Sequence, residues 1–260
     1  MSAGDWQGRD LGSKTIEYSR QDAILYALAV GVGGEHLDLI YERDLRVLPT
    51  FGLTLAQWAP DVIAESGGYG DKAVHASQSI DVRAPLPASG SVTMRARVED
   101  VWDKGSAAVL TIVVESDFFS AKWTIFAPGQ GGFGGERGPS AQPPTSLDDA
   151  DSLTLSTAEN QALLYRLTGD AHDIHVDPEA AARIGQPRPI LHGLCTLAAV
   201  TIPLATHAGK HPADLAHLSG RFSGVVYPGE TLAVLSAAGG LFAVRSESQE
   251  VISNGKVVFS

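Results

Sequence analysis

The sequence contains a single cysteine, Cys195, among its 260 residues. One thiol cannot form an internal disulfide, which fits a protein of a reducing compartment. Cys195 lies inside the apolar run LHGLCTLAAV. We therefore expect a buried, unreactive thiol at this position rather than a nucleophile.

Basic residues are also scarce: 19 lysines and arginines stand against 30 aspartates and glutamates, a formal net charge of -11. A nucleic-acid-binding surface needs a basic footprint, so the composition argues against nucleic acid as a partner. No apolar run approaches the roughly 20 residues of a membrane span. The first residues, MSAGDWQGRDLGSK, lack the charged and then apolar order of a secretory signal. We expect a cytoplasmic protein without a membrane span.

The remaining sequence divides into two halves. Residues 131–151 are dense in Gly, Pro, Ser and Asp and predict a linker between a unit at 1–130 and a unit at 152–260. Each half has a helical pattern that precedes several strand patterns. In the first half the helix is expected at 20–33 and the strands at 75–86, 90–117 and 119–127, with a hairpin turn at DKGS. In the second half one long helix is expected at 189–209 and strands at 215–227, 230–240, 241–249 and 251–260, with a turn at the NG of the last.

One helix followed by several antiparallel strands, occurring twice, predicts an α+β protein built from two similar units. The hot-dog arrangement, a long helix wrapped by a curved antiparallel sheet, would explain the length if two copies follow in tandem. Periodicity alone does not select this arrangement over other α+β folds.

The run GDAHDIHVDP, Gly169 to Pro178, concentrates titratable groups. Asp177 and Pro178 fit the N-cap and first position of a helix through EAAARIG. A zinc site would use the side chains of His172, Asp173, His175 and Asp177. A third strong ligand is missing from that set, so we expect no metal. Proton transfer by Asp170 and His175 is the remaining interpretation.

The run YRLTGDAHDIHVDP, followed by PILHGLCTLAAV, closely resembles the signature of the type 2, R-specific enoyl-CoA hydratases, the MaoC-like dehydratases. Other segments resemble the same family in the same order, among them YERDLRVLPTFG, FAPGQGGFGG and RFSGVVYPGETL. The resemblance implies a double hot-dog fold whose C-terminal unit is catalytic and whose N-terminal unit accommodates long acyl chains. It also implies a homodimeric hydro-lyase of fatty-acid metabolism, without cofactor, that interconverts trans-2-enoyl-CoA and (3R)-3-hydroxyacyl-CoA.

Matching positions to the family assigns individual residues. Asp170 and His175 match the catalytic pair, and Gly193 matches the glycine whose backbone N–H forms the oxyanion hole. The acyl-CoA contacts of the family fall at His75, Ala76, Lys104 and Phe222. The sequence departs from the family at His172 and Asp173, where an Asn-Pro pair is usual. The Asn helps to hold the catalytic water, which His172 can replace in part, and an Asp can still turn the chain.

The assigned residues suit the chemistry of hydration. A water must lose a proton as it attacks Cβ, Cα must gain a proton, and the enolate oxygen must be stabilised. Asp170 and His175 can face one water and give syn addition, while Gly193 can supply a backbone N–H. Three alternatives stay open: a dehydratase acting on acyl-carrier-protein (ACP) thioesters, an acyl-thioester-binding protein without chemistry, and a hot-dog thioesterase.

Overall fold

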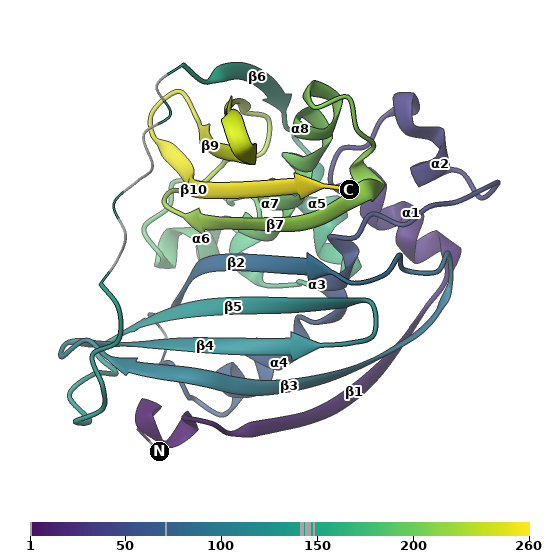
Figure 1. Ribbon diagram of the computed structural model, residues 1–260. Coiled ribbons are helices and arrows are strands. Elements are labelled where there is room, and N and C mark those ends of the chain that lie inside the picture. Colours follow the sequence, from purple (N-terminus) through teal and green to yellow (C-terminus); the bar gives the residue numbers. More distant parts are fainter. Residues whose placement is uncertain (1, 71, 141–142, 144–146, 148) are drawn as a thin grey trace.

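The computed structural model describes residues 2–70, 72–140, 143, 147 and 149–260. The described strands form a 10-stranded antiparallel sheet in the order β1-β3-β4-β5-β2-β7-β10-β9-β8-β6 (Figure 1). The strands of the first unit are β1 (Asp10–Tyr18), β2 (Val74–Val82), β3 (Gly90–Asp103), β4 (Ala107–Glu115) and β5 (Phe119–Pro128). Those of the second unit are β6 (Asp151–Ser156), β7 (Leu215–Phe222), β8 (Thr231–Ala237), β9 (Leu241–Arg245) and β10 (Glu250–Phe259).

The two halves of the sheet have the same strand order. The first unit runs β1-β3-β4-β5-β2, and the second, counted from its outer edge, runs β6-β8-β9-β10-β7. The units meet where β2 pairs with β7 in antiparallel register, with Gln78 opposite Gly220 and Ile80 opposite Leu218. The predicted α+β class and the repetition of one kind of unit are therefore confirmed.

Most of the helices lie behind the sheet in the view of Figure 1, and those of residues 20–40 lie at its right-hand side. In the first unit the helices are α1 (Arg20–Ala29), α2 (Leu37–Ile40), α3 (Phe51–Leu55) and α4 (Trp58–Glu65). In the second unit they are α5 (Gln161–Tyr165), α6 (Pro178–Arg183), α7 (Gly193–Ala199) and α8 (Thr201–His207). Short 3-10 turns cover Ala3–Trp6, Gly34–His36, Arg166–Thr168, Asp173–His175, Pro212–Asp214 and Ala238–Gly240.

The core lies between the sheet and these helices and is continuous across both units. Alternation along β5 explains how the sheet contributes side chains to this core, since Trp123 is buried while Lys122 is exposed. Aromatic rings join the two halves: the ring of Tyr26 in α1 lies 5.1 Å from that of Phe51 and 6.0 Å from that of Tyr165 in α5. Burying each such ring contributes about 1.5–3 kcal/mol, so the units share one hydrophobic interior.

The single long helix expected at 189–209 is wrong in one respect, because the structure divides it into α7 and α8 at Val200. Pro203 has no N–H to donate to the carbonyl of Ala199, and its ring crowds that carbonyl. The hydroxyl of Thr201 donates to the carbonyl of Ala198 at 2.6 Å. A side chain thus replaces backbone bonding where the helix is interrupted.

The hairpin turn expected at Asn254-Gly255 is also wrong. β10 continues through both residues, and its register shifts there against β7 and β9. Asn254 has φ 50°, a left-handed conformation that Asn tolerates better than most residues. The NG pair therefore forms a β-bulge inside a strand.

Six of the described strands and α-helices were not predicted from the sequence: β1, β6, α2, α3, α4 and α5. β6 begins at Asp151, the last residue of the predicted linker, and its burial pattern alternates only weakly, as is common for an edge strand. Residues 141, 142, 144–146 and 148 of that linker lie outside the described residues. Its GGFGG segment is anchored, because the N–H groups of Gly132 and Gly134 each donate to the carboxylate of Asp103 at 2.8 Å. The unit boundaries at 130 and 152 stay a prediction.

Candidate active site

Gly169 determines how the acidic and histidine-rich loop leaves the turn at Arg166–Thr168. Its φ is 147°, a conformation that side chains disfavour. A Cβ at this position would lie 3.1 Å from Cγ2 of Thr54 in α3. Glycine therefore lets the loop of the second unit approach the helices of the first, and it delivers Asp170 to the boundary between them.

Asp170 is held through one of its two carboxylate oxygens. Its Oδ1 accepts from the backbone N–H of His172 at 3.3 Å and lies 2.5 Å from Nδ1 of the same residue. Burial raises the pKa of Asp170, but the hydrogen bond from His172 and the nearby histidines outweigh burial and hold this pKa well below its usual range. The same hydrogen bond raises the pKa of His172. Within the described part of the chain, Oδ2 of Asp170 receives no hydrogen bond.

His175 ends the 3-10 turn that begins at Asp173, and its side chain is buried. Its Nδ1 lies 2.8 Å from the carbonyl of Ile190; because a carbonyl only accepts, Nδ1 carries the hydrogen and Nε2 keeps a lone pair. Burial lowers the pKa of His175. The imidazole is therefore neutral at pH 7, with Nε2 available as a proton acceptor.

His192 is a third histidine of the site and was not singled out from the sequence. It is buried, its ring stacks on that of His175 with centroids 3.6 Å apart, and its Nε2 lies 3.1 Å from the backbone carbonyl of Asp170. One ligand atom from each of Asp170, His175 and His192 lies within 4.8 Å of the other two. The signal that could have revealed it is an otherwise polar residue inside the apolar run PILHGLCTL.

The three residues could in principle hold a metal ion, but the ring geometry does not fit one. A metal bound by histidine lies in the plane of the imidazole, about 2.0–2.1 Å from the nitrogen. The planes of His175 and His192 are stacked and inclined by only 24°. Their lone pairs therefore cannot converge on one ion at that distance.

Gly193, Phe222 and His75 are neighbours of one another. Gly193 is the first residue of α7, and a Cβ there would lie 3.1 Å from Cε1 of Phe222 at the end of β7. The ring of Phe222 lies 4.8 Å from that of His75 in β2. Ala76 follows at a register shift of β2 against β5. Burial lowers the pKa of His75 to about 4, so this histidine is neutral at pH 7.

Two assigned residues have other surroundings. Lys104, in the turn between β3 and β4, donates its ammonium hydrogens to the carbonyls of Arg137 and Pro139 at 2.6 and 2.7 Å. Asp173 opens the 3-10 turn that contains His175, and its carbonyl accepts from the N–H of Asp177 at 2.7 Å. The structure thus gathers Asp170, His172, His175, Gly193, Phe222 and His75 about the junction, whereas the described contacts of Lys104 are made with the chain beyond β5.

Comparisons with known proteins match the two halves separately. Residues 16–128 match the MFE-2 hydratase 2 N-terminal domain, and residues 140–258 match the MaoC like domain. Enoyl-CoA hydratase ChsH3 of Mycobacterium tuberculosis is 39% identical over 246 residues, which cover 87% of this chain and 86% of that protein. The 3-hydroxyacyl-thioester dehydratase Y of the same organism is 37% identical, covering 85% of this chain and 82% of that protein.

The chain belongs to the hydratase 2 family of MaoC-like dehydratases.

Solved structures have the same fold. Full-length peroxisomal multifunctional enzyme type 2 of Drosophila melanogaster superposes with a TM-score of 0.80 at 32% identity, over 96% of this chain and 48% of that longer one. A MaoC-like dehydratase of Phytophthora capsici gives a TM-score of 0.83 at 22% identity, over 98% of this chain and 96% of that chain. A Mycobacterium tuberculosis protein described as having a double hotdog fold gives 0.60 at 13% identity, over 100% of this chain and 98% of that chain. The expected family and the expected double hot-dog fold are both confirmed.

Two smaller expectations for this hydratase 2 chain are also confirmed. Asp177 is the N-cap of α6, accepting from the N–H of Glu179 at 2.9 Å, and Pro178 is the first helical residue. Cys195 is fully buried, and burial raises the pKa of its thiol.

Among the described residues, none of the helices has the length and hydropathy that a membrane span requires.

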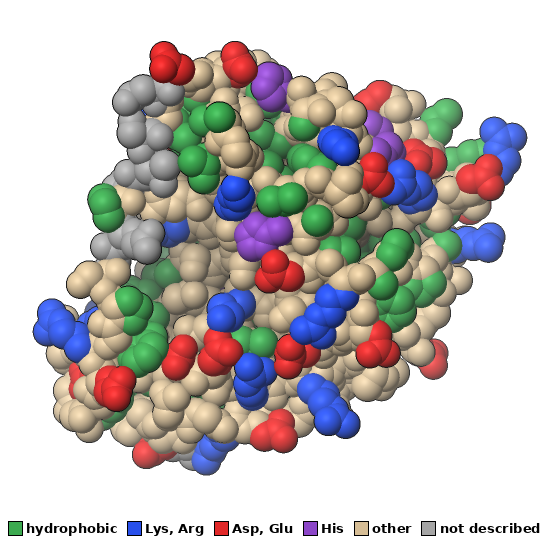
Figure 2. Space-filling model, viewed as in Figure 1, with side chains coloured by type: hydrophobic (Ala, Val, Ile, Leu, Met, Phe, Trp, Pro, Cys, Tyr) green, Lys and Arg blue, Asp and Glu red, His purple; other side chains and the backbone are tan. Residues whose placement is uncertain are grey.

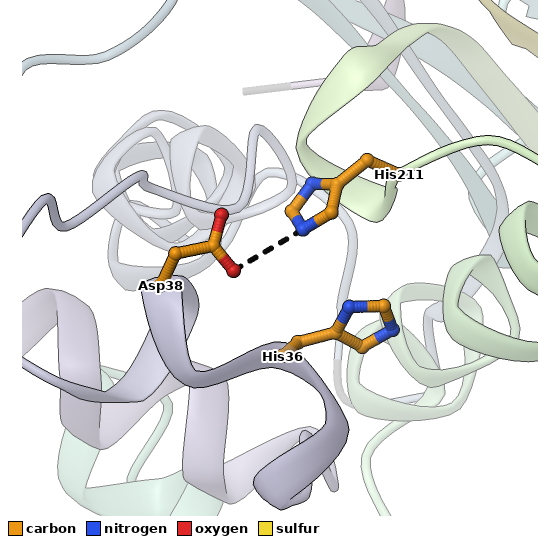
Figure 3. A group of neighbouring side chains, drawn as sticks. All are labelled: His36, Asp38 and His211. Atoms are coloured by element: carbon orange, nitrogen blue, oxygen red, sulfur yellow. Dashed lines mark hydrogen bonds and ion pairs between the residues drawn. The ribbon is translucent and has the colours of Figure 1, made fainter.

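A second histidine cluster of the hydratase 2 chain lies at another contact between the two units (Figure 3). His36, Asp38 and His211 have ligand atoms within 4.8 Å of one another. Nδ1 of His211 accepts from the N–H of Ala213 at 3.1 Å and lies 3.0 Å from Nη1 of Arg46. Its hydrogen is therefore on Nε2, 3.3 Å from Oδ1 of Asp38, and no lone pair remains there for a metal. This hydrogen bond joins the two units, and we call His36, Asp38 and His211 the polar clasp.

The outer face of the sheet carries charges of both signs, interspersed over the strands of the first unit (Figure 2). Glu99 pairs with Arg97 at 2.9 Å and with Lys122 at 2.5 Å, and Glu115 pairs with Arg83 at 2.8 Å. Such exposed pairs contribute about 0–1 kcal/mol each. This mixed surface differs from the basic stripe that nucleic-acid binding requires.

Proposed function

We propose that this chain adds water to trans-2-enoyl-CoA to give (3R)-3-hydroxyacyl-CoA and catalyses the reverse dehydration, a hydro-lyase reaction of fatty-acid metabolism that needs no cofactor. The observation that carries the proposal is the pair Asp170 and His175: a carboxylate oxygen of the first lies within 4.8 Å of a ring nitrogen of the second. The carboxylate is held ionised and the imidazole neutral. Both can therefore accept hydrogen bonds from one water placed between them.

In the proposed reaction the water oxygen bonds to Cβ while one of its protons passes to the Asp170–His175 pair. The same pair returns a proton to Cα, so the double bond is consumed and no net proton is taken up. Because both groups face one water, oxygen and hydrogen add to the same face of the double bond. Syn addition is therefore the expected stereochemical course.

The enolate oxygen of the intermediate requires a hydrogen-bond donor. As the first residue of α7, Gly193 has no carbonyl four residues earlier within the helix to which its N–H could donate. The ring of Phe222 covers the position where a side chain would start. We assign the Gly193 N–H as the oxyanion donor, a kind of contact worth roughly 3–4 kcal/mol in the transition state of other enzymes.

The remaining assigned residues are proposed to bind the thioester. His75, Ala76 and Phe222 lie at the junction of β2 and β7, beside Gly193. His172 is proposed to replace the family's Asn by fixing Oδ1 of Asp170, which leaves Oδ2 for the water. Asp173 is proposed to replace the family's Pro as the residue that turns the chain. Lys104 would have to leave the two carbonyls that hold its ammonium in order to meet a CoA phosphate.

CoA is the proposed carrier, and an ACP thioester is the second candidate. A relative named as a 3-hydroxyacyl-thioester dehydratase supports thioester chemistry in general. The net charge of -11 does not favour docking of a second acidic protein, which supports CoA over ACP. Comparing rates on the two carriers decides between them. A homodimer and a cytoplasmic location remain part of the proposal.

The test is the loss of enoyl-thioester absorbance on addition of crotonyl-CoA and of longer enoyl-CoA substrates. The wild-type chain should consume at least one chain length, and Asp170→Asn and His175→Ala should each abolish turnover with an unchanged fold by circular dichroism. His207→Gln, at an exposed histidine paired with Asp151, is the matched control and should keep wild-type rates. Binding without turnover at every chain length would leave only the non-catalytic alternative, and release of free thiol would indicate a thioesterase.

A further inference from the structure

The site contains one buried titratable side chain that the proposed reaction does not use. His192 is 1% exposed and immediately precedes Gly193, the proposed oxyanion donor. It packs between the loop that carries Asp170 and the turn that carries His175, and the ring of Tyr165 lies 4.7 Å from it on the core side. Buried polar groups are normally hydrogen-bonded, so the contacts of this ring with its neighbours indicate its role.

The hydrogen-bond partner of His192 fixes its tautomer. Nε2 lies 3.1 Å from the backbone carbonyl of Asp170, which can only accept, so Nε2 carries the hydrogen. Nδ1 then has the lone pair, and it is buried without a partner within the described residues. Burial, together with the nearby His175, lowers the pKa of His192 to about 3. The ring is neutral throughout the physiological range.

The other contact of His192 supports His175. The two rings stack at 3.6 Å, while Nδ1 of His175 donates to Ile190 on its edge. The edge contact sets the direction of the ring in its plane, and the stack prevents it from tilting out of that plane. Together they leave Nε2 of His175 as the atom directed to the water.

We infer that His192 is a positioning residue of the hydratase site, holding Asp170 through its backbone carbonyl and His175 through the stacked ring. This inference rests on the proposed function for its kinetic consequence, although the contacts themselves do not. His192 does not touch the reacting atoms: its N–H is occupied by Asp170, and its lone pair is enclosed. A displacement of about 1 Å in a catalytic group can cost about 10²-fold in rate, so losing either contact should lower kcat more than it raises KM.

Three substitutions separate the two contacts. His192→Gln keeps an N–H at the end of the side chain for Asp170 but loses most of the stack. His192→Phe keeps a flat ring against His175 but loses the donor, and His192→Ala removes both. The exposed control His207→Gln accounts for any general effect of a histidine-to-glutamine change.

The expected order of kcat on crotonyl-CoA is wild type, then Gln, then Phe, then Ala. We expect Gln within about tenfold of the wild type and Phe about 10²-fold lower, with KM within about threefold in both. Melting temperatures are measured alongside, so that a variant that fails to fold is set aside and the other two decide. Wild-type kcat in the Phe variant would overturn the inference. So would a change confined to KM, or a Gln variant as slow as Ala with an unchanged melting temperature.

A second readout does not depend on turnover. Titration of 15N-labelled histidine, with the His175 signal assigned from His175→Gln, should show the Nδ1–H tautomer for His175 in the wild type. In His192→Ala, water can reach the exposed ring face, so the pKa of His175 should rise toward 6.5, whereas His192→Phe should keep it lowered. An unchanged His175 titration in the Ala variant would overturn the inference. If the wild type hydrates no enoyl-CoA but this titration behaves as expected, the proposed function fails and the positioning by His192 stands.

Discussion

The two units share one strand order but differ in the chain that leads to their central strands. Before β2 the first unit has α3 and α4, whose inward positions are filled by apolar residues such as Phe51 and Leu53. Before β7 the second unit has the loop of Asp170 and His175 and then α7. Both segments reach the same junction, where Thr54 of one faces Gly169 of the other. In the proposed function the second unit supplies the proton-transfer groups, whereas the first unit supplies apolar side chains at the same junction.

The largest effect on activity is expected when a proposed proton-transfer group is removed from the second unit. Asp170→Asn keeps the shape of the side chain but removes its charge, so the pair can no longer take up a proton from the water. General acid–base catalysis contributes about 10²–10⁴-fold, and because Asp170 and His175 act as one pair we expect a loss at the upper end of this range, which leaves no detectable turnover. Steady-state hydration of crotonyl-CoA measures it. A kcat near that of the wild type would remove Asp170 from the chemistry.

Gly193→Ala should have the next largest effect. The new methyl group would lie 3.1 Å from Phe222, so the ring of Phe222 must move by a few tenths of an ångström, and where the ring cannot move α7 shifts and carries the proposed oxyanion donor with it. Loss of one such donor costs about 10²–10³-fold in kcat, and a partial shift should cost about 10-fold or more. Ala198→Gly, further along α7, serves as a control for small changes within the helix. An unchanged kcat would contradict the oxyanion assignment.

The pH dependence should follow His175. Burial lowers the pKa of this residue below 6.5, and the carboxylate of Asp170 stays ionised because its pKa is lowered too. The acid limb of kcat/KM should therefore lie below pH 6.5, falling about tenfold per pH unit once His175 is protonated. A profile from about pH 5 to about pH 9 measures it. An acid limb centred above pH 6.5 would mean that His175 is more hydrated than the structure indicates.

The lowered pKa of His192 links stability to pH. His192 has a pKa of about 3 in the folded protein against 6.5 when exposed. Between those values the unfolded chain binds more protons, so the free energy of unfolding should fall as the pH drops from 6.5 toward 3. Urea unfolding across this range tests the sign, and His192→Phe should show a smaller decrease. Stability that is independent of pH in this range would contradict the burial of a neutral His192.

The smallest effect is expected at Arg46, which contacts the polar clasp of His36, Asp38 and His211. Arg46 pairs with Asp214 at 2.5 Å and contacts His211, but both partners of the ion pair are partly exposed. Arg46→Met should therefore lower the free energy of unfolding by about 1 kcal/mol or less and leave kcat unchanged. Urea unfolding together with the hydration assay checks both. A large loss of stability would mean that the clasp, rather than the shared core, holds the two units together.

Local patterns predicted much of this structure. Alternation revealed β2 to β5 and β7 to β9, and the Asp177-Pro178 cap located α6, because these depend on neighbouring residues alone. The same reasoning failed at Asn254-Gly255, since a bulge and a hairpin turn require the same left-handed backbone and only the partner strands distinguish them. It also missed β1 and β6, whose edge positions bury few side chains and leave little alternation to read.

The residues of the candidate site also fall into two groups, those that a local motif predicts and those that only the folded structure reveals. The motif identified Asp170, His175 and Gly193, since their spacing is local. His192 emerged only from three-dimensional contacts with a loop more than 15 residues earlier in the chain, which no periodicity reports. His75 likewise reaches the site through the pairing of β2 with β7, a contact between units that the sequence of either unit does not contain.

Hydratase activity of the Asp170–His175 pair is tested by the hydration of trans-2-enoyl-CoA of several chain lengths, with chiral analysis of the product. The wild type, Asp170→Asn and His175→Ala are compared. The wild type should form the (3R)-3-hydroxyacyl-CoA, by addition of water to one face of the double bond, and both variants should be inactive while folded. Formation of the (3S) product, or full activity in either variant, would contradict it.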